Sequence, residues 1–236
     1  MKDYRIKKSV DVHDVDYNGV ARTSAILQYL QSAAEAQLTE NGMSYDELKG
    51  QGRAFILSKI RLEVTSALGV GIPVSAITFP CDSRGYSFLR CFALECDGKI
   101  VARAASLWAL IDTDNRSLVR VNDFELGLDT LPANDLVPER IRLPENMSRV
   151  GEYTVRYSDI DRNRHMNNTR YPDIYSHFLP LDKKMITNIT VSYLNEAKMG
   201  DTLTVMRGEE DGAFYFRTLL PSGKINSEAQ IVISDI

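Results

Sequence analysis

The chain has 236 residues, 44% of them hydrophobic, which is enough for one large domain or two small ones with a buried core. Its formal net charge of −4 contains no basic block, so the composition gives no indication of nucleic-acid binding. Three cysteines make a poor disulfide framework, the start lacks an apolar signal segment, and no run approaches the roughly 18 apolar residues of a membrane span. These features predict a cytoplasmic protein.

The first half, 1–131, is predicted to begin with a short strand and continue into a long helix. One buried stripe with helical spacing marks that helix: Ile26, Tyr29, Leu30, Ala33 and Ala34. Thr23 or Ser24 is expected to cap its start, and Gly42 to follow its end. Alternating apolar segments then predict antiparallel strands, with a hairpin turn at Asp97-Gly98.

The second half, 149–236, repeats the first. Three prolines in "LPANDLVPERIRLPEN" predict an extended linker over 132–148 between them. At an offset of 145 positions, Asp16 and Asn18 align with Asp161 and Asn163. The apolar helical stripe recurs as well, at Tyr171, Ile174, Tyr175, Phe178 and Leu179, with Pro172 in the expected first turn.

Further hairpin signals, Asp211-Gly212 and Ser222-Gly223, follow in the second half. Each half therefore reads as a short strand, a long helix and several antiparallel strands. A single half would leave exposed sheet edges, so we expect the two halves to pair edge to edge.

The segment "SDIDRNRHMNN" carries the first candidate site. If it is extended, Asp161, Asn163 and His165 at alternate positions point to one side. The plainer interpretation is that Asp and Asn form a turn and the His is incidental. The first half keeps Asp16 and Asn18 but has Val20 in place of His165, so turn geometry explains the Asp and Asn while the His is additional. An imidazole here suits a hydrogen-bond donor or a proton carrier.

The segment "VSYLNEAKMGD" carries the second candidate, Glu196. Strand alternation would place Glu196 on the same face as apolar Leu194, where burial would raise its pKa and make it a base. The alternative is a solvent-exposed carboxylate at a strand end. The first half has Ala67 at the matching place, so again only the second half carries the ionisable group.

Other chemistries find little support in the sequence. The three histidines are not spaced as metal ligands, so no metal is expected. Neither a P-loop, a dinucleotide-binding glycine motif nor a serine-hydrolase elbow occurs, so no cofactor is expected.

The run Asp161-x-Asn163-x-His165-Met-Asn-Asn-x-x-Tyr171, followed by Glu196, resembles the acyl–acyl-carrier-protein thioesterases. "ARAASLWALIDTDNRSL" is similar to a segment near the end of that family's first repeat. The resemblance implies an α+β tandem hot-dog fold, each repeat a long helix wrapped by a curved antiparallel sheet. It also implies hydrolysis of fatty acyl thioesters on acyl carrier protein, in fatty acid biosynthesis. Plant members carry a Cys directly after this Glu, whereas here Ala197 follows, so a mechanism built on that thiol cannot operate.

The resemblance makes Asp161, Asn163, His165 and Glu196 the expected catalytic residues. Glu196 would take a proton from water, Asn163 and His165 would orient the water or polarise the carbonyl, and Asp161 would fix the imidazole or the amide. Backbone N–H groups after Asn168 could add an oxyanion site. The roles of Glu196 and His165 could be exchanged.

Substrate contacts and competing functions stay open at this point. The acyl chain is expected to run into the first half, along Ile26, Leu27 and Leu30. The acidic carrier is expected near three arginines, which are Arg162, Arg164 and Arg170. The alternatives are an acyl-coenzyme A thioesterase, a non-catalytic acyl-binding protein and a hot-dog dehydratase, and the chain could be a monomer or a homodimer.

Overall fold

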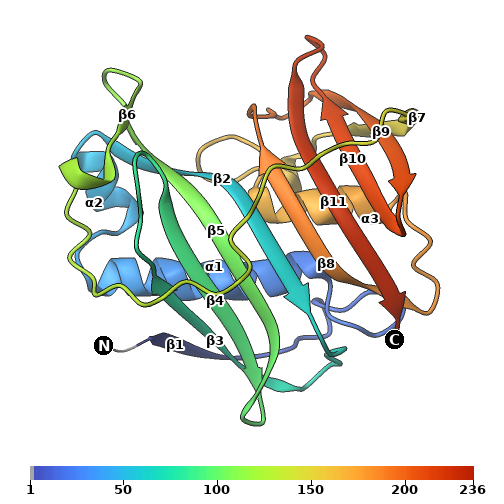
Figure 1. Ribbon diagram of the computed structural model, residues 1–236, viewed down its shortest axis with the longest axis horizontal. Helices are drawn as coiled ribbons and strands as arrows, with labels where there is room; N and C mark the ends of the chain where they lie inside the picture. The colour runs from blue at the N-terminus through green and yellow to red at the C-terminus, as the bar shows by residue number, and fades with distance from the viewer. Residues whose placement is uncertain (1–2) are drawn as a thin grey trace.

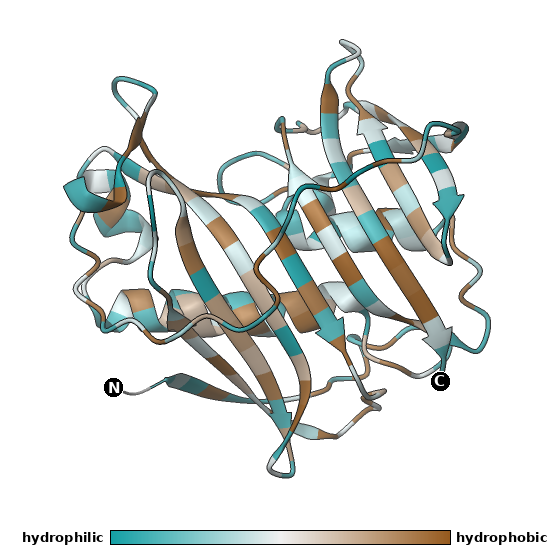
Figure 2. Cartoon of the chain, in the orientation of Figure 1, coloured by the Kyte–Doolittle hydropathy of each residue, from teal (hydrophilic) through white to brown (hydrophobic). Residues whose placement is uncertain are grey.

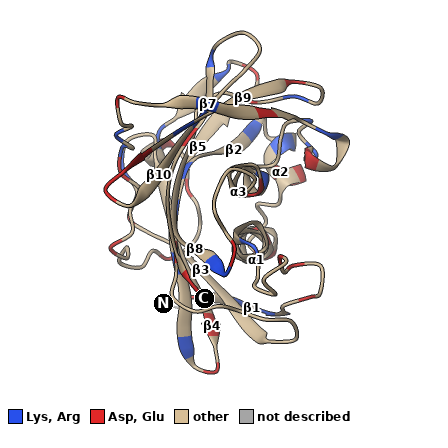
Figure 3. Cartoon of the chain, turned by 90° about the vertical axis from the view of Figure 1, so that its right-hand side faces the viewer, with Lys and Arg blue, Asp and Glu red and all other residues tan. Residues whose placement is uncertain are grey.

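The computed structural model describes residues 3–236 as one strongly curved antiparallel sheet with its helices on the inner face (Figure 1). Seen from the side, the sheet curves around α1 and α3 (Figure 3). The first half contributes β1 (Tyr4–Ser9), α1 (Thr23–Glu40), α2 (Tyr45–Gly50), β2 (Arg53–Val64), β3 (Pro73–Pro80), β4 (Phe88–Cys96), β5 (Lys99–Asp112), β6 (Ser117–Val119) and the short 3-10 helix η1 (Val121–Asp123).

The second half contributes a matching set of strands but less helix. Its elements are β7 (Ser148–Thr154), the 3-10 helices η2 (Tyr157–Asp159) and η3 (Asn168–Arg170), α3 (Tyr171–Ser176), β8 (Lys184–Tyr193), β9 (Thr202–Glu210), β10 (Ala213–Leu219) and β11 (Ile225–Asp235). None of the helices in residues 3–236 is long and apolar enough to cross a membrane.

The strand order shows the duplication directly. It reads β1-β3-β4-β5-β2 and then β8-β11-β10-β9-β7, so the second half repeats the first half in mirrored order. The halves join where β2 pairs with its counterpart β8. Arg61 and Thr190, each three residues before the end of its strand, lie opposite each other, which places a local twofold axis between them. The predicted edge-to-edge pairing and the tandem hot-dog fold are confirmed.

The predicted long helix of the first half is α1, with 18 residues. All five residues of its apolar stripe are buried against the sheet. Its N-cap residue is Arg22, which makes no side-chain cap, and Thr23 and Ser24 are buried inside the helix, so the expected cap is wrong. Gly42 follows the end of the helix with φ +71°, as the sequence predicts.

The predicted long helix of the second half is wrong, because α3 has only six residues. Pro172 lies in its first turn as expected, and Ile174 and Tyr175 are buried. The helix then ends because Pro180 cannot continue it and disfavours helical geometry in the preceding residue. Phe178 packs against the core from the loop that replaces the missing turns.

The hairpin turns lie where the sequence predicts them. Asp97 and Gly98, and likewise Asp211 and Gly212, all have positive φ between paired strands. Figure 2 shows apolar and polar residues alternating along the strands, as expected for a sheet that buries one face.

The expected linker has no helix or strand before β7 begins at Ser148, and it crosses the outer face of the sheet (Figure 1). Leu136 is buried there with Cys81, Cys91 and Ala105. Ile141 packs in the same way on Tyr215 of the second half. The linker therefore covers apolar patches on the outer face of both halves.

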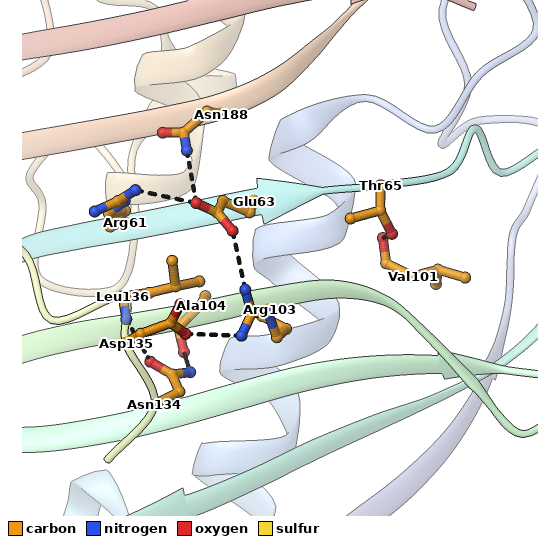
Figure 4. A network of polar contacts seen from close by, with 10 residues as sticks. All are labelled: Arg61, Glu63, Thr65, Val101, Arg103, Ala104, Asn134, Asp135, Leu136 and Asn188. Atoms are coloured by element: carbon orange, nitrogen blue, oxygen red, sulfur yellow. Dashed lines mark hydrogen bonds and ion pairs between the residues drawn. The ribbon is translucent and has the colours of Figure 1, made fainter.

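A polar network links the two halves and the linker on this outer face (Figure 4). Glu63 of β2 accepts hydrogen bonds from Arg61 at 3.0 Å, Arg103 at 3.2 Å and Asn188 of β8 at 3.0 Å. Arg103 also reaches Asp135 of the linker at 2.7 Å. Glu63 thus accepts hydrogen bonds from both halves, next to the junction of β2 and β8.

Replacing Glu63 with Gln is expected to lower the free energy of unfolding by about 1–2 kcal/mol, because its charge-assisted bonds from Arg61, Arg103 and Asn188 become bonds to a neutral amide oxygen. Urea denaturation followed by circular dichroism measures this difference. The control is Asp135→Asn, whose carboxylate is largely exposed and should change stability by less than about 0.5 kcal/mol. Equal stability of Glu63→Gln and the unmodified chain would show that the network contributes nothing.

Candidate active site

The segment around Asp161 forms a tight turn rather than the extended strand considered above. The N–H of Asp161 donates to the carbonyl oxygen of His165 at 2.9 Å, and that of Arg164 donates to the carbonyl oxygen of Asp161 at 3.0 Å. The Asp161 carboxylate accepts the N–H groups of Asn163 at 2.8 Å and His165 at 3.3 Å. Asp161 therefore fixes the backbone that carries His165, not the imidazole or the amide as expected.

The first half contains the same turn. Asp16 accepts the N–H groups of Asn18 at 2.8 Å and Val20 at 3.2 Å, and its own N–H donates to the Val20 carbonyl at 2.9 Å. Gly19 has φ +75°, and its counterpart Arg164 adopts φ +64° although it is not a glycine. The interpretation that turn geometry requires the Asp, while His165 is additional, agrees with these contacts.

The two asparagines face the opposite half of the molecule. Asn18 donates to the carbonyl oxygens of Leu181 at 2.7 Å and Lys184 at 3.2 Å. Asn163 instead accepts the Tyr45 hydroxyl of α2 at 2.6 Å through Oδ1, and among the described residues its Nδ2 has no hydrogen-bond acceptor. The amide N–H₂ of Asn163 is thus available to a water or a carbonyl oxygen.

His165 and Glu196 meet, with Nε2 and Oε2 3.1 Å apart. The backbone holds the two segments together, because the N–H of Met166 donates to the Ala197 carbonyl at 2.8 Å. The His165 side chain is 29% exposed and that of Glu196 is 57% exposed, so solvent reaches the carboxylate. The structure thus brings the two second-half candidates into direct contact.

The expected burial of Glu196 beside Leu194 is wrong. β8 ends at Tyr193, and both Leu194 and Glu196 are exposed. The N–H groups of Leu194 and Asn195 both donate to the carbonyl oxygen of Asn226, at 2.9 and 3.1 Å, which turns the chain out of the strand. Strand alternation therefore does not extend to Glu196.

A buried polar cluster lies behind this loop. Asn226 is fully buried, accepts the Thr218 hydroxyl at 2.8 Å and donates to the Tyr171 hydroxyl at 2.9 Å. The ring of Tyr171 packs edge-on against Tyr193, with centroids 5.2 Å apart. Sequence reasoning missed Asn226 and Tyr45. Asn226 carries one signal, because it is a polar residue at an inward position of an alternating strand.

Burial raises the pKa of Tyr171 to about 12, with a smaller contribution from the charge of Glu196. The pKa of this tyrosine is higher in the folded protein than its ordinary value of about 10. Its contribution to stability is therefore complete below pH 10 and is lost as the pH rises through about 12. We therefore expect stability to fall between pH 10 and 12. Thermal melting of Tyr171→Phe across this window should show a shallower decline than the unmodified chain, and identical slopes would contradict the assignment.

The expected oxyanion donors at the start of the second helix are already used in part. The N–H of Thr169 donates to the Asn167 side chain at 2.9 Å, and that of Arg170 donates to the Asn167 carbonyl at 2.9 Å. The Thr169 and Arg170 amides are therefore occupied.

Two of the three arginines expected near a carrier already have acidic partners. Arg162 bonds Asp46 at 3.0 Å and stacks 3.5 Å above the Tyr45 ring, and Arg170 lies 3.5 Å from Asp173. Arg164 is exposed and has no carboxylate within 4.0 Å among residues 3–236. Of the three arginines, Arg164 is therefore the one available to an acidic partner.

The residues expected to line an acyl slot, Ile26, Leu27 and Leu30, are buried in the core, and Ile26 also lines the second of the two cavities described next. A groove of about 720 Å³ opens where α3 is short, lined by Phe178, Arg207 and Phe214 among others. A second cavity of about 370 Å³ lies beside the turn of the first half. Neither of these two cavities is lined by His165 or Glu196.

The fold and the site together define a duplicated hot-dog protein with an ionisable pair in one half only. Residues 1–126 match the model of the acyl-ACP thioesterase N-terminal domain, and residues 144–233 match that of the acyl-ACP thioesterase C-terminal domain. The chain belongs to the acyl-ACP thioesterases, a family of thioester hydrolases.

Curated relatives carry related names. A chloroplastic dodecanoyl-[acyl-carrier-protein] hydrolase of Cinnamomum camphora is 27% identical over 142 residues, 52% of this chain and 36% of that protein. The chloroplastic acyl-[acyl-carrier-protein] hydrolase FATB2 of Cuphea viscosissima is 22% identical over 82% of this chain and 52% of its own length. The chain thus spans about half or less of these relatives.

Solved structures match over nearly the whole chain. An acyl-ACP thioesterase from Bacteroides thetaiotaomicron has a TM-score of 0.89 at 22% identity, covering 98% of this chain and 97% of its own. A 12:0-ACP thioesterase from Umbellularia californica has a TM-score of 0.81 at 17% identity, covering 99% and 98%. At these identities the likeness establishes the fold.

Proposed function

We propose that the protein hydrolyses fatty acyl-acyl-carrier-protein thioesters to free fatty acid and holo carrier protein, in fatty acid biosynthesis. The observation that carries the proposal is the 3.1 Å contact between His165 and Glu196. The equivalent positions of the first half hold Val20 and Ala67, which cannot exchange protons. Family membership supplies the substrate class.

In the proposed reaction Glu196 takes a proton from water as the water oxygen attacks the thioester carbonyl carbon. The tetrahedral intermediate then expels the phosphopantetheine thiolate, which takes up the proton held by Glu196, so the step balances. His165 donates from Nε2 to one Glu196 oxygen and leaves the other for the water. The 3.1 Å contact serves equally with His165 as the base and Glu196 as its partner.

Asn163 is assigned to the developing oxyanion. Its Oδ1 is held by the Tyr45 hydroxyl, which directs the free Nδ2 donor away from α2. Asp161 acts through the backbone, because it positions the turn that carries both Asn163 and His165. In this assignment the second half, 149–236, performs the chemistry and the first half, 1–131, receives the acyl chain.

Free fatty acid release from a panel of C8–C18 acyl-carrier-protein and acyl-coenzyme A thioesters tests the proposal. Carrier-selective release supports it, whereas faster release from coenzyme A would make the protein an acyl-coenzyme A thioesterase. Binding without release from any thioester would leave a non-catalytic acyl-binding protein. Arg164→Glu should raise KM more for the carrier-bound substrate than for coenzyme A thioesters, because an acidic protein surface offers the exposed guanidinium more carboxylates than coenzyme A offers phosphates.

A further inference from the structure

The cavity of about 370 Å³ lies at the place in the first half that corresponds to the His165–Glu196 site in the second. We call it the twin cavity. Its apolar lining includes residues from the first-half turn, the end of β2 and the start of β8, namely Val20, Ala21, Val64, Leu68, Met185 and Ile186. Four of these, from Val20 to Leu68, are buried core residues, as is Ile186.

The twin cavity is remote from the ionisable pair. Met185 and Ile186 begin β8, whereas Glu196 follows the other end of that strand. β8 has ten residues, so its two ends are about 30 Å apart. The β8 residues of the twin cavity and the ionisable pair therefore lie at opposite ends of that strand.

Side-chain size explains why the first half has this space. Ala21 occupies the position that Met166 fills, fully buried, directly after His165 in the second half. Val20 likewise replaces His165, and Ala67 replaces Glu196. The backbone turn is the same in both halves. The three smaller residues of the first half therefore leave more space and no ionisable pair on an unchanged backbone.

The rim of the twin cavity is polar and offers a cation. Asp16 uses its carboxylate within the turn, and Asp173 pairs with Arg170 at 3.5 Å. Arg22 donates to the backbone carbonyl of His13 and has no carboxylate within 4.0 Å among residues 3–236. Apolar lining residues together with a guanidinium that has no carboxylate partner suit an aliphatic chain that ends in a carboxylate. The volume falls in the range of about 300–1,000 Å³ of small-molecule sites.

We propose that the twin cavity is a non-catalytic site for a free fatty acid, whose chain contacts the apolar lining residues and whose carboxylate binds Arg22. Val20 and Ala67 replace the two members of the ionisable pair, so the twin cavity lacks that pair. Three other residues that carry a carboxylate or an imidazole line it, which are Asp16, Asp173 and His177. The proposal goes beyond the proposed hydrolysis, and it holds or fails independently of it.

The test is isothermal titration of the full chain with dodecanoate, using Ala21→Met as the main variant. This change installs the side chain that the second half already accommodates in the same turn, so it fills the cavity with little strain. We expect it to weaken dodecanoate binding by at least about tenfold. It should leave thioester hydrolysis and its chain-length profile within about twofold, since the pair is a strand's length away.

A second variant keeps the test decisive if Ala21→Met folds poorly. Arg22→Gln should weaken dodecanoate several-fold and leave dodecanol unchanged, because only the acid uses the guanidinium. Glu196→Gln should bind dodecanoate as tightly as the unmodified chain. Dodecanoyl-coenzyme A, titrated into Glu196→Gln, separates an acyl thioester from the free acid as occupant.

Three outcomes would overturn the proposal. Dodecanoate binding that is unchanged in both Ala21→Met and Arg22→Gln would place the acid elsewhere. A shifted chain-length profile of hydrolysis in Ala21→Met would make the cavity the far end of the substrate channel. Preferential binding of the thioester over the acid would assign the cavity to substrate.

Discussion

Glu196→Gln and His165→Ala are each expected to lower kcat for fatty acyl thioester hydrolysis by about 10²–10³, as removal of one group of a polarised site typically does. The reason is geometric: the two side chains contact each other at 3.1 Å, and both remain open to solvent, where water and a thioester can approach. Steady-state fatty acid release from acyl carrier protein measures the effect. Because the two groups act as one unit, the double variant should lose little more than either single variant.

The matched control is Glu210→Gln, an exposed carboxylate at the end of β9 in the same half. It removes the same charge from the same half and should leave kcat within about twofold, since surface changes away from special features are close to neutral. Thermal melting of these four variants beside the unmodified chain separates lost chemistry from lost folding. Near-normal turnover in both Glu196→Gln and His165→Ala would exclude the pair as the catalytic centre.

The duplication was the most informative feature of the sequence, because it predicts contacts between distant residues. It led to the prediction that the two halves pair edge to edge, as β2 and β8 do, and to the equivalence of the Asp16 and Asp161 turns. It also singled out His165 and Glu196 as the differences between two otherwise similar halves.

Local patterns were less informative where a distant residue decides the conformation. Strand alternation predicted a buried Glu196, but the carbonyl of Asn226, on β11, draws the chain out of the strand. The helical stripe of the second half continues to Leu179, yet Pro180 ends the helix early. Tyr45 reaches Asn163 from α2, a contact that no spacing in the sequence indicates.

The two aspartates of the twin turns allow positioning to be separated from stability. Asp161→Ala removes the acceptor of the Asn163 and His165 N–H groups, and Asp16→Ala removes the acceptor of the Asn18 and Val20 N–H groups. Each change should lower the free energy of unfolding by about 1–2 kcal/mol, because two backbone bonds are lost. Guanidinium denaturation should show similar losses for both.

Activity should distinguish them. Asp161→Ala is expected to reduce kcat by about tenfold or more with little change in KM, because a small displacement of His165 spoils its alignment with Glu196. Asp16→Ala should retain near-normal kcat, since its turn carries Val20 instead. Asp161→Asn keeps an Oδ1 acceptor for the same two amides and should restore most of the rate.

A purely structural Asp161 would give a different pattern. Both alanine variants would then lose activity in proportion to their lost stability. Asp161→Asn and Asp16→Asn would restore kcat to the same extent. A direct catalytic role of the carboxylate charge would leave Asp161→Asn as inactive as Asp161→Ala. If Asp161→Asn recovers the rate and Asp161→Ala does not, Asp161 contributes the backbone geometry of the turn and not its charge.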